Sequence, residues 1–326
     1  MESQRQNNLF SWIHEQTASN IEYQGKRFQR HFEANATTAS RLRIVYQCHT
    51  TEVELAQVLL GVNTLNSIAS ITRHSGLHCI ELCLSETTLS EVKTRFNALE
   101  GVEVFTVANA HPRLDIPGLL VMDMDSTAIE IECIDELAIM AGVGAEVAEV
   151  TERAMQGELD FEQSLRARVA KLAGAEASII DNLCQRLPLM PGLTEMVSEL
   201  QANRWRLVLA SGGFTPFVGH LKQLLNLDAA FANELVIEDG KLIGEVRGEV
   251  VDAQFKADTV LGAAAKWQIS NGQRLAIGDG ANDIPMVEAA DFGIAFHAKP
   301  KLVAAADGVI RQLDLRVLPY MLLDLR

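Results

Sequence analysis

The sequence predicts an α/β protein with a doubly wound parallel-sheet core and an inserted helical cap, preceded by a small α+β ferredoxin-like domain. Three observations support this fold class. Residues 41–110 follow the order strand, helix, strand, strand, helix, strand, which is the order of a ferredoxin-like sandwich. From residue 118 onward, strands and helices alternate across short loops, as in parallel sheets. A helical stretch at about 130–200 interrupts this alternation after its first strand, as expected for an inserted cap.

The composition fits a folded protein of two domains and argues against several function classes. The chain has 326 residues, of which 48% are hydrophobic, so a large core can form. Its net charge of -15 argues against binding to nucleic acid or to an anionic membrane surface. No apolar stretch approaches membrane-spanning length, and the first 40 residues lack an apolar signal core. The five cysteines show no paired zinc-type spacing, so we expect a cytoplasmic protein in a reducing compartment.

The first domain can be divided into elements from its apolar spacing. Residues 1–40 show no clear period, and we treat them as an N-terminal extension. The expected elements that follow are a strand at 42–48, a helix at 51–65, paired strands at 67–72 and 76–84, a helix at 85–99 and a strand at 102–107. This arrangement resembles the ACT regulatory domains of amino-acid metabolism. The resemblance makes residues 41–110 a candidate serine sensor or homodimerisation unit.

The second domain, residues 118–326, follows a linker at 111–118 that contains proline and glycine. The cap is expected to contain helices at 132–141, 145–156, 161–172 and 176–187. The core is expected to contain strands at 119–122, 206–210, 230–235, 274–277 and 293–295, with helices at 214–225, 256–267 and 284–290. A turn at Glu238-Asp239-Gly240 predicts a hairpin over residues 236–248. Ligands of such sheets bind where the strands end, so the functional residues are expected in those loops.

The loop after the first core strand contains a pair of acids. Asp123 and Asp125 are separated by one residue and point the same way on an extended segment. Two adjacent carboxylates repel each other unless a cation or a shared proton is present. Ser126 and Thr127 add hydroxyl donors for a phosphate at the start of the helix that should follow. The alternative is that Asp125 or Ser126 simply caps that helix.

Two later loops and one lysine complete the set of candidate residues. Ser211-Gly212-Gly213 follows a strand, and its glycines let backbone amides approach an anion closely. The loop at 278–283, which reads Gly-Asp-Gly-Ala-Asn-Asp, combines glycines with oxygen ligands suited to a hard cation. Each loop could instead be an ordinary turn, and Lys256 could be a solvated surface residue.

Taken in chain order, these segments resemble the haloacid dehalogenase superfamily of phosphatases, over residues from about 119 to 326. The resemblance rests on Asp-x-Asp-Ser-Thr at 123–127, Ser-Gly-Gly at 211–213, the lysine at 256 and Gly-Asp-Gly-x-Asn-Asp at 278–283. Further segments at 130–136, 161–169, 191–192 and 231–233 are similar to the phosphoserine phosphatase family within it. Ala128 departs from the pattern, since a larger aliphatic residue is common there, and this should alter packing rather than chemistry.

The resemblance implies an Mg²⁺-dependent enzyme that hydrolyses O-phospho-L-serine through an aspartyl-phosphate, the last step of serine biosynthesis. It makes Asp123 the nucleophile, and it makes Asp125 the acid that protonates the leaving oxygen and later activates water. Mg²⁺ would be held by Asp123, the backbone carbonyl of Asp125 and Asp279, with Asp283 in support.

The resemblance also assigns the groups that bind the substrate. Ser211, Gly212 and Lys256 would hold phosphate oxygens, and Asn282 would orient the substrate or a metal-bound water. The remaining roles belong to the cap. Glu132 and Arg168 would bind the ammonium and the carboxylate of phosphoserine, and Met155 and Phe161 would line the apolar side of the pocket. Taken alone, Glu132 could be a helix-start charge and Arg168 a solvated residue.

Three rival functions deserve comparison with this expectation. Another phosphatase or phosphotransferase of the superfamily would act on a different small phosphate monoester, such as a sugar phosphate, with no zwitterion for Glu132 and Arg168. An ion-pumping ATPase shares similar loops but needs membrane helices. A phospho-accepting signalling module would take phosphate without turnover, and it needs neither the second-step residues nor a large cap.

Overall fold

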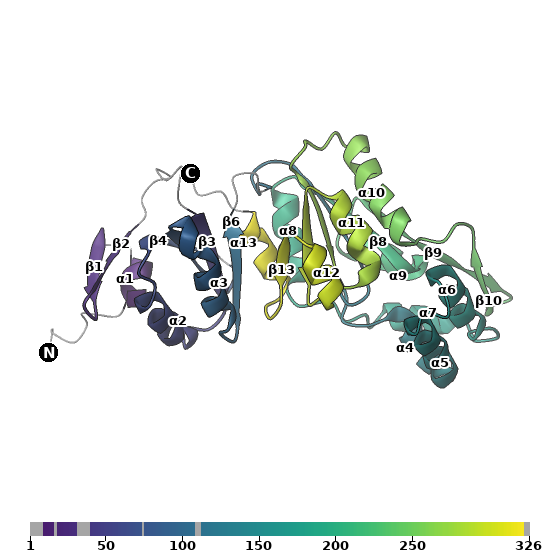
Figure 1. The fold of residues 1–326 in the computed structure, drawn as a ribbon. Helices are drawn as coiled ribbons and strands as arrows, with labels where there is room; N and C mark the ends of the chain where they lie inside the picture. The colour runs from purple at the N-terminus through teal and green to yellow at the C-terminus, as the bar shows by residue number, and fades with distance from the viewer. Residues whose placement is uncertain (1–8, 16–17, 31–39, 74, 108–111, 323–326) are drawn as a thin grey trace. The chain divides into compact units, whose positions relative to one another are not determined.

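The computed structural model describes residues 9–15, 18–30, 40–73, 75–107 and 112–322 (Figure 1). By internal contacts the chain forms two compact units, one of residues 1–115 with 310–326 and the other of residues 116–309. Neither unit contains, among these residues, a helix long and apolar enough to cross a membrane.

The first unit is built on a four-stranded antiparallel sheet in the order β4-β5-β3-β6. This order is that of a ferredoxin-like sandwich, as the sequence predicts. The elements are β3 (Ser40–Tyr46), α2 (Thr51–Leu60), β4 (Leu65–Ile71), β5 (His78–Leu84), α3 (Leu89–Asn97) and β6 (Val102–Val107). Alternate residues of β3, such as Leu42 and Ile44, form a buried core with α2 and α3, as the twofold period of a strand requires.

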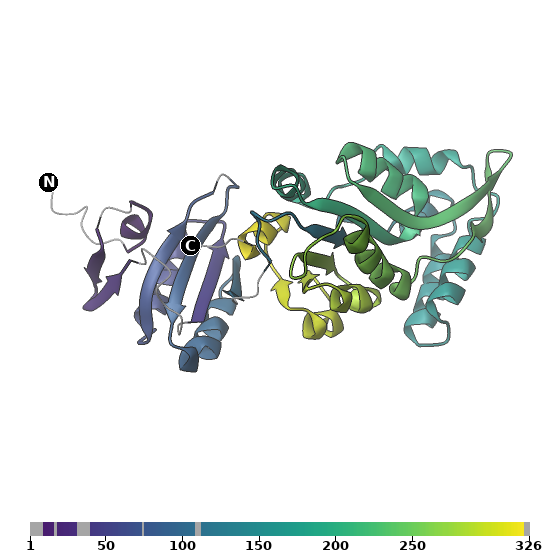
Figure 2. The same ribbon diagram turned by 90° about the horizontal axis from the view of Figure 1, so that it is seen from above.

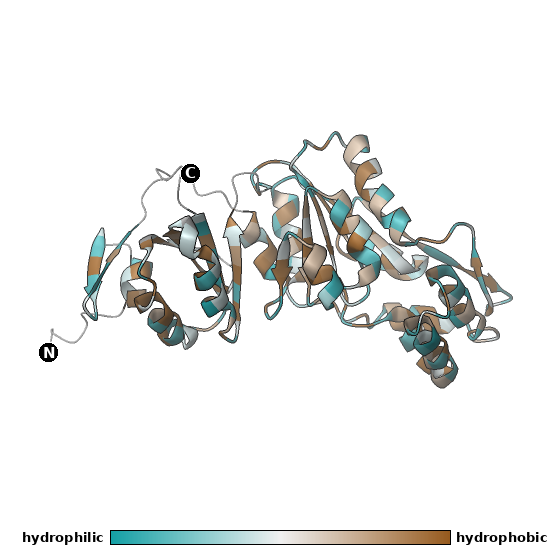
Figure 3. Cartoon of the chain, in the orientation of Figure 1, coloured by the Kyte–Doolittle hydropathy of each residue, from teal (hydrophilic) through white to brown (hydrophobic). Residues whose placement is uncertain are grey.

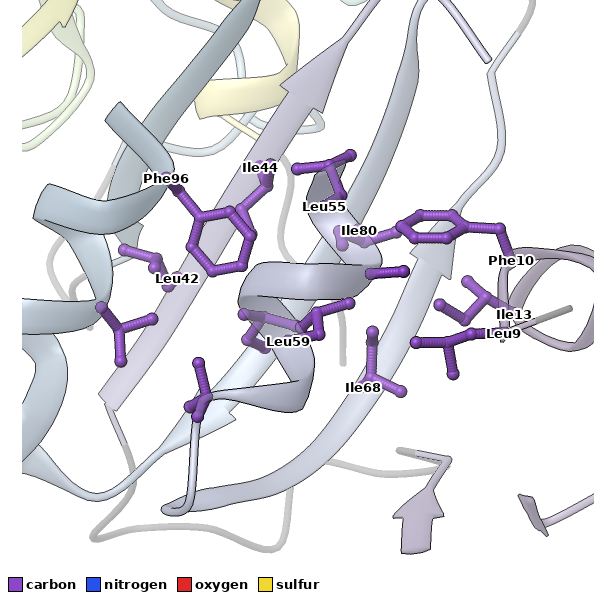
Figure 4. Packing of buried hydrophobic residues seen from close by; sticks show 14 of the residues in the cluster. Leu9, Phe10, Ile13, Leu42, Ile44, Leu55, Leu59, Ile68, Ile80 and Phe96 are labelled. Carbon is purple, nitrogen blue, oxygen red and sulfur yellow. The ribbon is translucent and has the colours of Figure 1, made fainter. Parts of the chain in front are cut away.

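The N-terminal extension contains structure that the sequence analysis did not predict. Helix α1 (Leu9–Glu15) is followed by a hairpin of β1 (Asn20–Tyr23) and β2 (Lys26–Gln29). Figure 4 shows Leu9, Phe10 and Ile13 of α1 beside the apolar side chains of the sheet and α2. A seven-residue helix has little intrinsic stability, so this burial stabilises α1.

The second unit contains a seven-stranded sheet in the order β10-β9-β8-β7-β11-β12-β13. Strands β9, β8, β7, β11 and β12 are parallel, and β10 is antiparallel to β9. The strands are β7 (Leu119–Met122), β8 (Arg206–Phe214), β9 (Ala229–Glu238), β10 (Lys241–Arg247), β11 (Arg274–Gly278), β12 (Phe292–Phe296) and β13 (Gly308–Ile310). Figure 3 shows the central strands as predominantly hydrophobic, as expected for a sheet covered on both faces.

Helices cover both faces of this sheet, so the fold is doubly wound (Figure 2). Helices α8 (Leu193–Ala202) and α9 (Thr215–Leu224) lie on one face. Helices α10 (Ala253–Lys266), α11 (Ile284–Ala289) and α12 (Pro300–Ala305) lie on the other. Apolar side chains of α10, α11 and α12 share a core with alternate residues of β7 and β8.

The cap comprises the first four of the five helices between β7 and β8, because the fifth, α8, covers the sheet. The four are α4 (Cys133–Met140), α5 (Gly144–Met155), α6 (Phe161–Ala170) and α7 (Ser178–Cys184). Helix α6 lies against β10 (Figure 1). At this contact Gly244 has φ +83°, and a Cβ there would lie 2.9 Å from Cβ of Ala173. Only glycine satisfies both conditions, so this position fixes how closely the cap approaches the hairpin.

One local expectation is wrong. No helix begins at Ser126 and Thr127; residues 124–129 form a turn instead, in which the backbone N–H groups of Thr127, Ala128 and Ile129 all donate to the Met124 carbonyl. Helix α4 begins six residues later, at Cys133. Three donors on one carbonyl, together with φ +56° at Ser126, keep the turn out of a helical path.

Candidate active site

The predicted loops meet at the carboxyl edge of the parallel sheet in the second unit. Asp123 follows β7, Ser211 lies near the end of β8, and Asp279 follows β11. These three strands are neighbours, with β7 between β8 and β11. Lys256 comes from the first turn of α10, whose N-terminus is capped by Asp252. The fold thus brings side chains that are far apart in sequence to one edge.

Lys256 joins two of the predicted acids. Its Nζ donates to Oδ1 of Asp123 at 2.7 Å and to Oδ1 of Asp283 at 2.8 Å, and all three residues are buried. Burial alone would lower the pKa of Lys256, but the two carboxylates outweigh it and raise that pKa. Lys256 is therefore a fixed cation and not the solvated surface lysine of the alternative interpretation.

Asp283 also shapes the loop that contains Asp279. Its Oδ2 accepts from the backbone N–H of Asp279 at 3.2 Å and of Gly280 at 3.1 Å. The Lys299 N–H donates to the backbone carbonyl of Asp279 at 3.0 Å. These bonds hold the loop while leaving the Asp279 side chain at the pocket.

The acids at this edge form a site suited to a hard cation. Carboxylate oxygens of Asp123, Asp279 and Asp283 all lie within 4.8 Å of one another. Burial and then the Asp283 charge raise the pKa of Asp123 well above its usual value and that of Asp279 to about 6. One lysine does not neutralise three clustered carboxylates, so a divalent cation with oxygen ligands fits the charge and chemistry of this site.

Asp125 lies beside the same site and is bonded to the start of the cap. Its Oδ1 accepts from the backbone N–H of Cys133 at 3.3 Å, which is the first residue of α4. Burial, and then the Glu132 charge, raise the pKa of Asp125 to about 7. Asp125 can therefore both hold and release a proton near neutrality. It also satisfies the start of α4, so part of the capping alternative is correct.

The loop at residues 211–213 approaches Asp125 closely, and its backbone is held in place by Asn233. A Cβ on Gly213 would lie 3.1 Å from Oδ2 of Asp125, so the glycine allows this approach. Ser211 is buried, and its Oγ accepts from the Gly213 N–H at 2.9 Å. The buried Asn233 donates to the Gly212 carbonyl at 2.8 Å and accepts from the Val251 N–H at 2.8 Å. This brace fixes the backbone that faces the pocket.

The cap closes the pocket with Glu132 and residues of α5 and α6. Oε1 of Glu132 accepts from the Ser126 hydroxyl at 2.8 Å. The Nε atom of Arg168 is buried and has no hydrogen-bond partner among the described residues, and burial lowers the pKa of Arg168. A buried guanidinium donor without a partner is costly, so Arg168 is well placed to receive an anionic ligand. Phe161 lines the pocket, as does Met155, a residue that is 77% exposed.

The resulting pocket has a volume of about 400 Å³. Ten predicted site residues line it, whereas Ser211 and Asp283 lie buried behind it. The ten are Asp123, Asp125, Glu132, Met155, Phe161, Arg168, Gly212, Lys256, Asp279 and Asn282.

Sequence reasoning missed several lining residues, of which Lys299 is the most informative. Lys299 follows β12, the next parallel strand along the sheet. Its position after a strand end was a usable signal, because the same criterion identified the other three loops. The other missed residues are Ile134, Asp135, Thr151, Leu165 and Phe214, whereas Gly213 and Gly280 belong to the two predicted glycine loops.

Comparison with known proteins agrees with this site. The family model of haloacid dehalogenase-like hydrolases matches residues 118–291. A phosphoserine phosphatase of Vibrio cholerae is 48% identical over 268 residues, which cover 82% of this chain and 80% of that protein. A crystal structure of a probable phosphoserine phosphatase from Vibrio cholerae matches 90% of this chain and 89% of its own, with a TM-score of 0.77 and 42% identity. A substrate-bound phosphoserine phosphatase structure matches 63% of this chain and 98% of its own, with a TM-score of 0.59 and 41% identity.

Proposed function

The chain belongs to the phosphoserine phosphatases of the haloacid dehalogenase-like hydrolase family, and on this premise we propose how its own residues hydrolyse O-phospho-L-serine to L-serine and phosphate. The observation that carries the proposal is the buried triad of Asp123, Lys256 and Asp283 beside Asp279. This arrangement supports Asp123 as the nucleophile, because it lies beside the fixed Lys256 cation and beside carboxylates that could hold a divalent cation, and the two cations together would balance the charge of a phosphate.

The proposed cofactor is Mg²⁺, held by Asp123, the backbone carbonyl of Asp125 and Asp279. The clustered carboxylate oxygens and their raised pKa values support a hard divalent cation. When bound, Mg²⁺ would neutralise charge on the phosphate and lower the repulsion between the acids. Asp283 supports the site through Lys256 and the loop amides.

In the first step, a carboxylate oxygen of Asp123 attacks phosphorus. The new bond is Asp123 oxygen to phosphorus, and the bond that breaks joins phosphorus to the serine oxygen. Lys256 and the Gly212 amide hold the other phosphate oxygens, and the buried Ser211 supports this loop through its bond with the Gly213 N–H. Asp125, with a pKa of about 7, gives its proton to the departing serine oxygen.

In the second step, a water molecule attacks the aspartyl-phosphate on Asp123. Asp125, which lost its proton in the first step, now accepts one from that water. The phosphorus–oxygen bond to Asp123 breaks, releasing phosphate and restoring the carboxylate. Asn282, which lines the pocket, orients the substrate or the water.

We propose that the cap selects the amino acid part of the substrate. The carboxylate of phosphoserine would pair with Arg168, whose Nε lacks a partner among the described residues, and the ammonium would pair with Glu132. Phe161 and Met155 line the apolar side of the pocket and limit water.

A substrate panel with cap variants tests this assignment. Glu132→Ala and Arg168→Ala are expected to lower kcat/KM for phosphoserine by about 100-fold or more, since each leaves a substrate charge unpaired. An achiral aryl phosphate, which lacks both charges, should be hydrolysed almost as well as by the parent chain. Steady-state kinetics with phosphoserine, a sugar phosphate and the aryl phosphate provide the measurement.

Arg166→Ala is a matched control, because Arg166 is an exposed arginine on the same helix. It should retain the activity of the parent on all three substrates. Equal losses on phosphoserine and the aryl phosphate would contradict the proposed role of the cap, and a preference for the sugar phosphate would contradict the substrate.

We further propose a cytoplasmic location and a homodimer formed through the N-terminal unit. The described residues include five free cysteines, which suits a reducing compartment. The dimer proposal rests on the ferredoxin-like architecture of that unit.

A further inference from the structure

A second cluster of ligand-type side chains lies in the first unit and has no part in the chemistry above. It consists of His14 at the end of α1, His49 before α2, Glu52 in the first turn of α2 and His78 at the start of β5. We call these four residues the histidine cluster. They come from three separate segments of the chain, so only the folded unit assembles them.

The four side chains converge on a small volume. Nitrogen atoms of His14, His49 and His78 all lie within 4.8 Å of one another. Oε1 of Glu52 lies 3.1 Å from Nε2 of His14 and 2.7 Å from Nδ1 of His49. The ring centroids of His49 and His78 are 4.2 Å apart. The three imidazoles thus lie close enough together to be donors to one ion, and the Glu52 carboxylate lies beside them, bonded to two of the rings.

The cluster is supported by surrounding residues. The Tyr46 hydroxyl donates to Oε1 of Glu52 at 3.1 Å, and its ring stacks on His78 with centroids 5.3 Å apart. Arg30 is buried, donates to the Ile13 carbonyl at 3.0 Å and lies 4.6 Å from the Trp12 ring. These contacts fix α1 and therefore His14, as partners outside a metal's ligand shell typically do.

Hydrogen bonds to Glu52 hold His14 and His49, whereas His78 joins the cluster through ring contacts with Tyr46 and His49. Protonated imidazoles at these distances would repel one another, and a single glutamate would balance one of them. His49 is 67% exposed at its side chain, so an ion can enter from solvent.

We propose that the histidine cluster binds a Zn²⁺-type transition-metal ion through three imidazole nitrogens and the Glu52 carboxylate. Four N and O donors match the coordination that Zn²⁺ prefers. Imidazole is a poor ligand for Mg²⁺, which takes oxygen ligands. The chain therefore contains two cation sites of different chemistry, one at the carboxylates of the second unit and one at the histidine cluster. A bound ion would join α1 to α2 and β5 and stabilise the first unit.

The proposal is tested by measuring metal binding to the full chain after a chelator has removed any bound ions. Asp279→Asn removes a ligand of the other cation site, and all binding variants are compared in this background with excess Mg²⁺. Titration with Zn²⁺ should show one tight site, and Co²⁺ should give the intense visible absorption of a tetrahedral centre. His49→Ala should weaken binding at least about tenfold and remove the Co²⁺ absorption.

His220→Ala is the matched control, because His220 lies on α9 and outside the cluster. It should bind Zn²⁺ as the background chain does. His78→Gln provides a second variant, and thermal unfolding shows whether each variant folds. Zn²⁺ should raise the Tm of the background chain and of His220→Ala but not of His49→Ala or His78→Gln. Equal Zn²⁺ affinity with and without His49, or loss of binding in His220→Ala, would overturn the proposal.

Discussion

Asp125 shows how one side chain can serve two opposite steps. Its pKa is raised to about 7 by burial and by the Glu132 charge, against about 3.9 for a free aspartate. Near neutral pH both protonation states are therefore populated. Burial and the Asp283 charge also raise the pKa of Asp123, against the lowering effect of the Lys256 ammonium that it contacts, so a bound divalent cation would be what keeps this nucleophile charged. The two aspartates are thus proposed to act differently, one as nucleophile and one as acid and base, because different groups surround them.

The pH dependence of the first step should report the Asp125 carboxyl. Phosphoryl transfer needs its protonated form, so kcat/KM for phosphoserine should fall as pH rises above about 7. Asp125→Asn should lower kcat by about 100- to 10,000-fold, the usual contribution of a general acid, and should lose this alkaline limb. The substrate's own ionisation is present in both proteins, so comparing the two pH–rate profiles isolates Asp125. An unchanged limb in Asp125→Asn would show that another group titrates.

At the residue scale, the sequence predicted the identity of the pocket groups better than their partners. Asp123 and Asp279 could be found because polar residues after apolar strands converge at one sheet edge, whereas Lys256, in the first turn of α10, was identified only through the resemblance to the superfamily. The brace from Asn233 to Gly212 and Val251 could not be derived, since it joins segments whose register depends on packing. Ser126 was expected at the start of a helix. Its hydroxyl instead donates to Glu132, and the turn around Met124 moves the start of α4 to Cys133.

At the scale of elements, helix α6 links local sequence to the pocket. Asp160 and Gln163 form a reciprocal capping box, in which Asp160 Oδ1 accepts from the Gln163 N–H at 2.8 Å and the Asp160 N–H donates to the Gln163 side chain at 3.1 Å. The helix that starts there presents Phe161 and Arg168 to the pocket. Its first turn therefore determines where two pocket residues lie.

Removing the cap of α6 should affect both stability and substrate binding. Asp160→Ala is expected to lower the free energy of unfolding by about 1 kcal/mol. It should also raise KM for phosphoserine more than it lowers kcat, because Arg168 is displaced while the core loops are not. Chemical denaturation and steady-state kinetics measure the two effects. Asp160→Ser keeps a side-chain acceptor and should behave like the parent. If it lost as much stability as Asp160→Ala, the loss of the helix cap would not be the cause of the destabilisation.

The elements also show where sequence patterns stop being informative. Most core strands and cap helices were predicted because their apolar period is strong. Helix α1 was missed because seven residues give about two turns of pattern, and its burial depends on β4 and α2 much later in the chain. Helix α8 and strand β13 were not assigned individually for the same reason: they are short or adjoin other helical segments.

At the scale of the whole molecule, the chain leaves the first unit near residue 115 and returns to it near residue 310. The domain prediction extended the catalytic part to Arg326, whereas the described residues from Ile310 onward group with the first unit. The buried Arg43 shows why. It pairs with Glu81 at 2.7 Å and donates to the Tyr320 carbonyl at 2.7 Å. A fragment ending at residue 110 would lack that carbonyl, so ligand tests on the first unit need the full chain.

We expect the attachment of the C-terminal segment to the first unit to depend most on Glu103 of β6. Its carboxylate is buried and accepts from the backbone N–H groups of Arg311, Gln312 and Leu313. Glu103→Ala would leave these donors without their acceptor, at a cost of about 3 kcal/mol or more in the free energy of unfolding. Hydrogen exchange should then accelerate first at residues 311–313 and in β6.

Two variants separate the role of the Glu103 carboxylate from a general loss of charge. Glu103→Gln keeps one carbonyl acceptor in the same place, so it should lose less stability than Glu103→Ala. Glu100→Ala removes an exposed acid from the same stretch and should change the free energy of unfolding by less than about 0.5 kcal/mol. If Glu103→Ala left exchange at residues 311–313 unchanged, the C-terminal segment would be held by apolar packing around Leu315 and Leu318 and not by this carboxylate.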